Sequence, residues 1–128
     1  MFSIFGKKPD AQAEKTALNR GQMAEQEAFD YLCRHGLKGL TRNYTCRYGE
    51  IDLIMSDDDM VVFVEVRYRK KNNYGSALES VNPNKMRKLR LAAQHYLCTH
   101  RHRAQQPCRF DVLAWQDNTM NWIKNAFY

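Results

Sequence analysis

Two acidic residues lie within the most apolar, strand-like part of the sequence. The segment GEIDLIMSDDDMVVFVEVRYRK, residues 49–70, carries Asp52 in its first apolar run and Glu65 in its second. A carboxylate removed from water is costly unless a proton, a cation or hydrogen bonds compensate it. Hard divalent cations such as Mg²⁺ bind carboxylate oxygens, carbonyl oxygens and water. The two residues are therefore candidate metal ligands.

The same segment predicts an antiparallel hairpin. Its strands are expected over residues 50–56 and 60–69, and the acidic residues 57–59 form the tip. A four-residue loop would place Asp52 directly opposite Glu65 on one face, whereas a three-residue loop would shift the register by one and separate them. The sequence leaves the loop length open.

Basic residues of the second of these strands offer an alternative to a metal. Side chains alternate between the two faces of a strand, so Glu65, Arg67 and Arg69 share one face. In this interpretation the arginines neutralise Glu65 and Asp52 in a surface ion-pair cluster, which is the more common arrangement in a generic hairpin. The ion-pair and metal interpretations both remain open.

A helix is predicted before the hairpin, over residues 16–35, and a strand follows over 37–46. Gly36 can supply the left-handed stop of this helix. Glu25 belongs to the inward-facing row, where a carboxylate needs a partner or a metal. In the metal interpretation, an oxygen-only site is formed by Asp52, Glu65, Glu25 and the carbonyl of Val66.

A second helix is predicted from Asn82, which acts as the N-cap, with Pro83 in the first turn. Two more strands are expected over residues 108–116 and 119–125. The expected fold is therefore α/β, a mixed central sheet flanked by helices in the order α-β-β-β-α-β-β.

Length and charge limit the class of protein. A chain of 128 residues with 44% hydrophobic content suits one compact domain, expected over residues 16–128, after a loosely ordered segment 1–15. The net charge of +6 favours an anionic partner such as nucleic acid. Because the sequence shows no signal-peptide apolar region, no membrane span and no Cys-x-x-Cys pair, a cytoplasmic protein is expected.

Basic residues frame the acidic ones in the sequence. One group ends the third strand and the other begins the second helix, so we predict a basic rim around an acidic centre. Such a rim would bind the phosphodiester backbone of DNA. The residues of the rim are Arg67, Arg69, Lys70, Lys71, Lys85, Arg87, Lys88 and Arg90.

These motifs resemble the PD-(D/E)XK nuclease superfamily, and the whole chain resembles its YraN-like family. The resemblance covers nearly all of the chain after about residue 18, through RGQMAEQEAFDYL, RNYTCRYGEIDLI, FVEVRYR, YGSALESVNPNKMRKLRLAAQHYL, RFDVLAW and NAFY. It implies a restriction-endonuclease-like fold, close to that of Holliday-junction resolvases. It also implies that Asp52 and Glu65 are metal ligands, that Glu25 is a third acidic contributor, and that residue 67 is the basic member of the E-x-K catalytic element.

At residue 67 the sequence departs from the family pattern, which usually has lysine there. Arg67 keeps its charge at all relevant pH values and can stabilise a phosphate, but it cannot act as a base. Its planar fork also places the charge differently from an ammonium. The lysines available to take this place in space are Lys70, Lys71 and Lys85.

The resemblance implies a DNA-binding endonuclease that uses Mg²⁺ or Mn²⁺ to hydrolyse phosphodiester bonds. Branched DNA is suggested by the likeness to the resolvases, and a two-fold homodimer would be needed to cut two strands symmetrically. Two alternatives stay open. One is a nucleic-acid-binding module without cleavage, favoured by Arg67, and the other is a structural or interaction domain whose acidic hairpin docks a protein partner.

Overall fold

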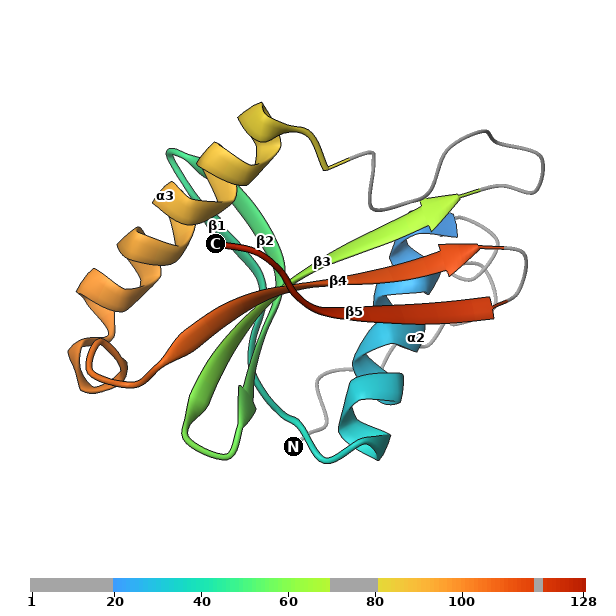
Figure 1. The fold of residues 1–128 in the computed structure, drawn as a ribbon, viewed down its shortest axis with the longest axis horizontal. Coiled ribbons are helices and arrows are strands. Elements are labelled where there is room, and N and C mark those ends of the chain that lie inside the picture. Colours follow the sequence, from blue (N-terminus) through green and yellow to red (C-terminus); the bar gives the residue numbers. More distant parts are fainter. Residues whose placement is uncertain (1–19, 70–80, 117–118) are drawn as a thin grey trace, which may run out of the picture.

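The computed structural model describes residues 20–69, 81–116 and 119–128 (Figure 1). The predicted order of helices and strands is confirmed. The elements are α2 (Arg20–Arg34), β1 (Lys38–Cys46), β2 (Gly49–Asp57), β3 (Met60–Arg69), α3 (Pro83–Thr99), the 3-10 helix η2 (Arg101–Arg103), β4 (Cys108–Gln116) and β5 (Thr119–Phe127). The predictions made for residues 1–15 and for Lys70 and Lys71 lie outside the described residues.

The described strands form one mixed sheet in the order β1-β2-β3-β4-β5. Strands β3 and β4 pair in parallel, and the other neighbouring strands pair antiparallel. A parallel pair needs a crossover connection, and α3 lies in the connection between β3 and β4. Each helix packs on the sheet, as the α/β order requires.

Helices cover both faces of the central strands. Phe63 packs with Leu89 and Tyr96 of α3, whereas Val64 packs on the other face in a cluster with Leu32 of α2. In Figure 1, α3 and α2 accordingly lie on different sides of the sheet. Strand β3 is thus apolar on both faces because both are removed from water.

Local signals in the sequence set the ends of both helices. Gly36 has a φ of 95°, and the N–H of Leu37 donates to the carbonyl of Leu32 at 3.1 Å, so a left-handed stop ends α2. The side chain of Asn82 accepts from the N–H of Lys85 at 2.9 Å, and Pro83 opens α3. Both predicted boundary signals are confirmed.

The β2–β3 hairpin closes with a two-residue turn at residues 58–59. Asp57 pairs with Met60 and Leu53 pairs with Val64. This is the register that the predicted four-residue loop produces, and Asp57 and Met60, the first and last residues of that loop, form one further pair. The three-residue alternative is therefore wrong. Extending this register beyond the last pair brings Asp52 to the level of Glu65.

Strand β2 is irregular at Asp52. Residues two apart in a regular strand share a face, yet Ile51 packs in the cluster on the α3 side and Leu53 in the cluster on the α2 side. The residue of β1 at the level of Asp52 is Asn43, which has a left-handed φ of 53°. Asp52 lies at this irregularity, where its Oδ2 accepts a hydrogen bond from the N–H of Val66 at 2.8 Å.

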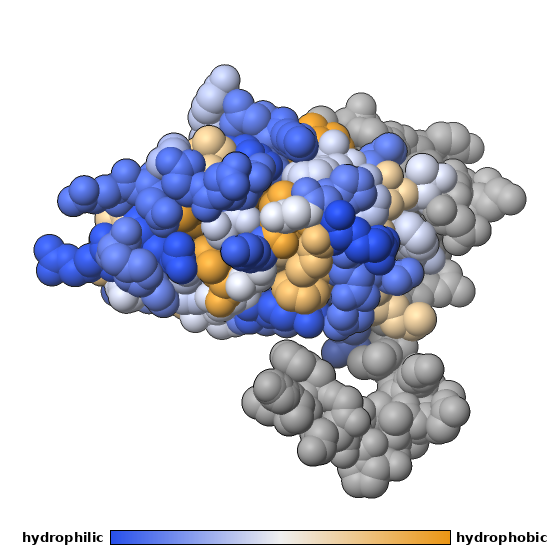
Figure 2. All heavy atoms as spheres, turned by 90° about the horizontal axis from the view of Figure 1, so that it is seen from below, coloured by the Kyte–Doolittle hydropathy of each residue, from blue (hydrophilic) through white to orange (hydrophobic). Residues whose placement is uncertain are grey.

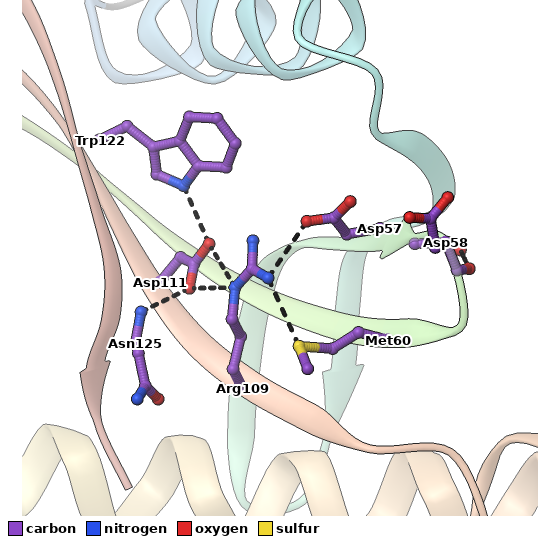
Figure 3. A network of polar contacts seen from close by, with 8 residues as sticks. Asp57, Asp58, Met60, Arg109, Asp111, Trp122 and Asn125 are labelled. Atoms are coloured by element: carbon purple, nitrogen blue, oxygen red, sulfur yellow. Dashed lines mark hydrogen bonds and ion pairs between the residues drawn. The ribbon is translucent and has the colours of Figure 1, made fainter.

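A buried polar network joins β4 to β5 and to the β2–β3 hairpin (Figure 3). Asp111 is fully buried and accepts from Arg109 Nε at 3.0 Å, from Trp122 Nε1 at 2.9 Å and from the N–H of Asn125 at 2.9 Å. Arg109 Nη1 also contacts Asp57 Oδ2 at 3.2 Å. These contacts satisfy a buried charge and tie three strands together.

The surface is predominantly hydrophilic on the side drawn in Figure 2, where only small apolar patches interrupt the polar residues. Among the residues that the structure describes, there is no helix of the length and apolar character needed to cross a membrane.

Candidate functional site

Asp52 lies where the ladder between β2 and β3 ends. Its Oδ2 accepts a hydrogen bond from the N–H of Val66 at 2.8 Å, so a side-chain oxygen satisfies this amide of β3. Burial raises the pKa of Asp52, the hydrogen bond from Val66 opposes the rise, and repulsion by Glu50 adds to it. Asp52 is thus a fixed carboxylate in a poorly hydrated place.

Glu65 is the most buried carboxylate of this region, with 5% of its surface exposed. Its Oε2 lies 3.1 Å from Arg67 Nη2 and 3.7 Å from Lys85 Nζ. Its Oε1 is buried and has no hydrogen-bond partner in the described part of the chain. Burial, followed by repulsion from Asp52, raises the pKa of Glu65 to about 7.

Glu25 approaches Asp52 from α2, which lies on one face of the sheet. Burial, then repulsion by Asp52 and by Glu50, raises the pKa of Glu25 to about 7, while Arg42 opposes this shift. In the amide orientation that satisfies its hydrogen bonds, Asn43 donates to Glu25 Oε1 and to Glu50 Oε2, both at 3.0 Å. One amide therefore links a carboxylate of α2 to one of β2.

Four carboxylates thus gather where α2, β2 and β3 meet, and we call this set the acidic centre. The raised pKa values of Glu25, Asp52 and Glu65 express a concentration of negative charge that a proton or a cation would relieve. Asp52 repels both Glu25 and Glu65, and Glu50 repels Glu25 and Asp52, so Asp52 is the residue that links the predicted acidic residues. The members are Glu25, Glu50, Asp52 and Glu65.

The acidic centre offers carboxylate oxygens, the donors that hard divalent cations prefer. Within residues 20–69, 81–116 and 119–128, no three His, Cys, Asp or Glu side chains are already arranged as a metal cluster. Mg²⁺, however, usually keeps several waters and needs only one or two carboxylates plus substrate oxygens. The unpartnered Oε1 of Glu65, close to Asp52, is a buried oxygen with spare ligand capacity. The donor set therefore fits Mg²⁺ or Mn²⁺.

The predicted basic residues divide into two groups. Arg67 and Lys85 reach the acidic centre through Glu65. The others on α3 are exposed: Arg87 donates to Asn84 Oδ1 at 3.2 Å, Arg90 donates to the carbonyl of Tyr128 at 2.6 Å, and Lys88 is exposed beside them. The side chain of Arg69 and residues Lys70 and Lys71 lie outside the described residues.

Sequence reasoning missed Asn43 and Glu50 as members of the site. Asn is uncommon within strands and tolerates a left-handed φ, so an Asn in the middle of the strand over residues 38–46 was the available signal. Nothing local in the sequence indicates that its amide links α2 to β2, because that contact depends on how the helix packs.

The described fold and the acidic centre define an α/β protein with a carboxylate cluster at the end of a strand ladder. The chain belongs to the uncharacterised protein family UPF0102, which matches residues 24–115. It is 45% identical over 116 residues to a UPF0102 protein of Pseudomonas fluorescens strain Pf0-1, covering 89% of this chain and 97% of that protein.

Other relatives show the same extent of similarity. A UPF0102 protein of Stutzerimonas stutzeri strain A1501 is 51% identical over 111 residues, covering 84% of this chain and 92% of that protein. A UPF0102 protein of Aeromonas hydrophila is 49% identical over 113 residues, covering 88% of this chain and 87% of that protein. The family membership expected from the YraN-like motifs is thereby confirmed.

Proposed function

We propose that this protein is a restriction-endonuclease-like nuclease that hydrolyses phosphodiester bonds in DNA with Mg²⁺ or Mn²⁺. The observation that carries the proposal is the pair Asp52 and Glu65. One carboxylate is fixed by a backbone amide, and the other has a buried oxygen without a hydrogen-bond partner among the residues that the structure describes. These are the positions that the resemblance to PD-(D/E)XK nucleases assigns to metal ligands, and the mixed sheet between helices suits that fold.

The ligands of the ion would be Asp52 and Glu65, with the carbonyl of Val66 and the carboxylate of Glu25 as further oxygen donors. When bound, such an ion lowers the pKa of a coordinated water toward neutrality and neutralises phosphate charge. The protein contributes the position of the ligands. Asp52 is held by Val66, and Glu25 is held by Asn43.

Hydrolysis requires the oxygen of a water molecule to bond to phosphorus while the bond from phosphorus to a sugar oxygen breaks. One proton of the water passes to the solvent, and the leaving sugar oxygen gains the other. Arg67 stays protonated, so it stabilises negative charge near Glu65 and does not accept the proton.

The substrate class follows from charge. The chain carries a net charge of +6, and Arg87 and Lys88 are exposed on α3 beyond the cations at Glu65. With Arg69, Lys70 and Lys71, which follow Arg67 in the sequence, these side chains would neutralise the DNA backbone. Branched DNA as the preferred substrate, a homodimer and a cytoplasmic location belong to the same proposal.

A DNA-binding module that has lost cleavage is the second candidate. The observation that favours it is the ion pair between Arg67 and Glu65, with Nη2 and Oε2 3.1 Å apart. An arginine held against Glu65 neutralises a ligand that the metal needs, and it replaces the usual lysine with a group of different shape.

A cleavage assay decides between these candidates. The purified protein is incubated with linear, flapped and four-way DNA in Mn²⁺, in Mg²⁺ and in EDTA, beside Asp52→Asn. Asp58→Asn is the matched control, because Asp58 is exposed in the turn with a φ of 55° that Asn also tolerates. We expect metal-dependent cleavage that Asp52→Asn lowers by about a hundredfold or more and Asp58→Asn leaves unchanged. DNA binding without cleavage in either metal would favour the second candidate.

A salt titration tests the DNA-binding part of the proposal separately. Because phosphate contacts release counterions, we expect the affinity for duplex or branched DNA to fall about tenfold or more from low to physiological salt. Fluorescence anisotropy measures this directly, and an affinity that does not change with salt would count against DNA as the partner.

A further inference from the structure

Two cations of different chemistry meet at one carboxylate oxygen. Glu65 Oε2 is 3.1 Å from the guanidinium of Arg67 and 3.7 Å from the ammonium of Lys85. Arg67 comes from the same strand as Glu65, whereas Lys85 reaches it from α3, on the other side of the connection over residues 70–80. The same two cations also lower the pKa of Asp52, so Glu65 and Asp52 share them, and the more loosely held of the two is the one that another anion can recruit.

The backbone of Lys85 is firmly held. Its N–H is the one that the Asn82 cap accepts, and Pro83 fixes the first turn of the helix. Val81, before the cap, and Leu89, one turn beyond Lys85, are buried in the cluster on this face of the sheet. Because the first turn of α3 is fixed in this way, it places Lys85 beside Glu65.

The side chain of Lys85 is held much less firmly than its backbone. It is 35% exposed, and its ion pair with Glu65 spans 3.7 Å, longer than a hydrogen bond. The side chain of Arg67 is 26% exposed and its contact is within hydrogen-bond distance. Lysine is a compact charge on a flexible stem, whereas the arginine fork is rigid and forms the more directional pair with a carboxylate.

We propose that Lys85 is the ammonium that contacts the scissile phosphate, while Arg67 remains the counter-ion of Glu65. This inference rests on the proposed nuclease function and names the group on this chain that binds the reacting phosphate. A divalent cation held by Glu65 would repel the Lys85 ammonium, and a non-bridging phosphate oxygen would give that ammonium a new anionic partner. Lys85 acts through its positive charge and takes no part in proton transfer.

The inference assigns to α3 a role that the E-x-K motif assigns to β3. With arginine at residue 67, the strand supplies a rigid cation, and the helix supplies the mobile ammonium. This division of roles predicts that exposed basic residues elsewhere on the surface cannot replace Arg67 or Lys85. It also predicts that Arg67→Lys restores part of the cleavage lost when Lys85 is replaced.

The test compares Lys85→Met with Lys38→Met. Lys38 is exposed and pairs with Ser56, at the end of β2 remote from Asp52, so its loss removes the same charge without touching the acidic centre. We expect Lys85→Met to lower Mn²⁺-dependent cleavage by about a hundredfold, as the loss of a preorganised charge contact does. In EDTA, where nothing is cleaved, we expect it to weaken DNA binding and to reduce the salt slope by about one, beyond the effect of Lys38→Met.

Two further measurements separate contact with the phosphate from a purely structural role. Calorimetry should show Mn²⁺ bound by Lys85→Met at least as tightly as by the parent, because a competing cation has been removed. The double variant Lys85→Met/Arg67→Lys should regain at least tenfold of the lost cleavage. If Lys85 only neutralises Glu65, Lys85→Met would lower the melting temperature and match Lys38→Met in DNA affinity and salt slope, and the inference would be overturned.

Failure of the proposed function is distinguishable from failure of this inference. If the parent binds DNA without cleaving it, the nuclease proposal fails, and the difference in salt slope between Lys85→Met and Lys38→Met still decides whether Lys85 contacts phosphate. If the parent cleaves and Lys85→Met cleaves equally fast, the nuclease proposal stands and the inference falls. If the parent does not bind DNA, both are overturned.

Discussion

The carboxylate of Asp52 accepts a hydrogen bond from the backbone amide of Val66 at 2.8 Å, so a side chain of β2 completes the ladder of β3. The same carboxylate repels Glu25 and Glu65, and both have a raised pKa. Asp52 therefore has two separable properties. Its oxygen accepts a hydrogen bond from the sheet, and its negative charge would bind a cation.

Asp52→Asn separates these two properties. The Asn oxygen can still accept from Val66, so we expect the fold to persist and the affinity for Mn²⁺ to fall by about tenfold or more, because a charged ligand is lost. Melting curves with and without Mn²⁺ measure both effects, since an ion that binds the native state raises the midpoint. If Asp52 is only paired with arginine, the substitution would instead lower the metal-free midpoint and leave the Mn²⁺ affinity unchanged.

The raised pKa values predict how stability depends on pH. The pKa of Glu25 is raised from 4.5 to about 7, so between these values the folded state binds more protons than the unfolded state. The free energy of unfolding of the metal-free protein should therefore fall as the pH rises from about 5 to about 7.5. Glu65, whose pKa is also raised to about 7, contributes in the same direction.

Glu25→Gln should flatten part of this pH dependence and stabilise the metal-free protein at pH 8. Glu27→Gln is the matched control, because Glu27 lies on the exposed face of the same helix. Thermal unfolding from pH 4.5 to 8.5 provides the measurement. A slope that is the same in Glu25→Gln and the parent would show that Glu25 does not bear the excess negative charge.

Substitutions at Arg67 test the role of this cation in the proposed nuclease. Its Nη2 pairs with Glu65, and its Nε is buried without a partner among the described residues. We expect Arg67→Ala to lower cleavage by about a hundredfold or more, since Glu65 would then draw Lys85 closer. Arg67→Lys should keep or raise the rate, because a phosphate near a site built for an ammonium accepts lysine. Single-turnover cleavage rates measure both variants, and an Arg67→Ala protein as fast as the parent would make Arg67 purely structural.

The Asp111 network predicts a stability effect that is independent of the acidic centre. Removing a fully buried carboxylate that accepts from Arg109, Trp122 and Asn125 leaves two N–H groups without their acceptor and leaves Arg109 with Asp57 as its one remaining carboxylate partner among the described residues. We expect Asp111→Ala to reduce the free energy of unfolding by about 3 to 5 kcal/mol, measured by urea denaturation. A loss below about 1 kcal/mol would mean that water replaces the carboxylate, and Mn²⁺ binding by the folded fraction should not change.

The order of the elements was predictable because the signals for it are local, whereas the register of the hairpin stayed open between two loop lengths. The acidic residues 57–59 mark the position of the turn, and the pairing of Asp57 with Met60 in the structure decides the register. Gly36 and Asn82 mark helix boundaries through their own backbone or side-chain preferences. Asp52 and Glu65 were found in the same way, because a charged residue within an apolar strand is visible in the sequence, whereas the fully buried Asp111 was not singled out.

The remaining parts of the site depend on contacts between distant elements. Asn43 joins Glu25 to Glu50 only after α2 packs beside β1, and Lys85 meets Glu65 only after α3 packs on the sheet. The irregularity of β2 at Asp52 lies at the level of Asn43 in the neighbouring strand, which has a left-handed φ. Alternation within a single strand carries no information about such contacts.

The parallel pairing of β3 and β4 also bears on the order in which the chain folds. Tight turns connect β1, β2 and β3, so pairing them closes short loops, whereas β3 and β4 meet only after α3 has been traversed. Closing the longer loop costs more conformational entropy and is slower. In pulsed hydrogen exchange we expect amides of β1 to β3 to gain protection before those of β4 and β5, and simultaneous protection would contradict this order. Asp52 and Glu65 would then be brought together early, while the water that β4 later displaces still hydrates β3.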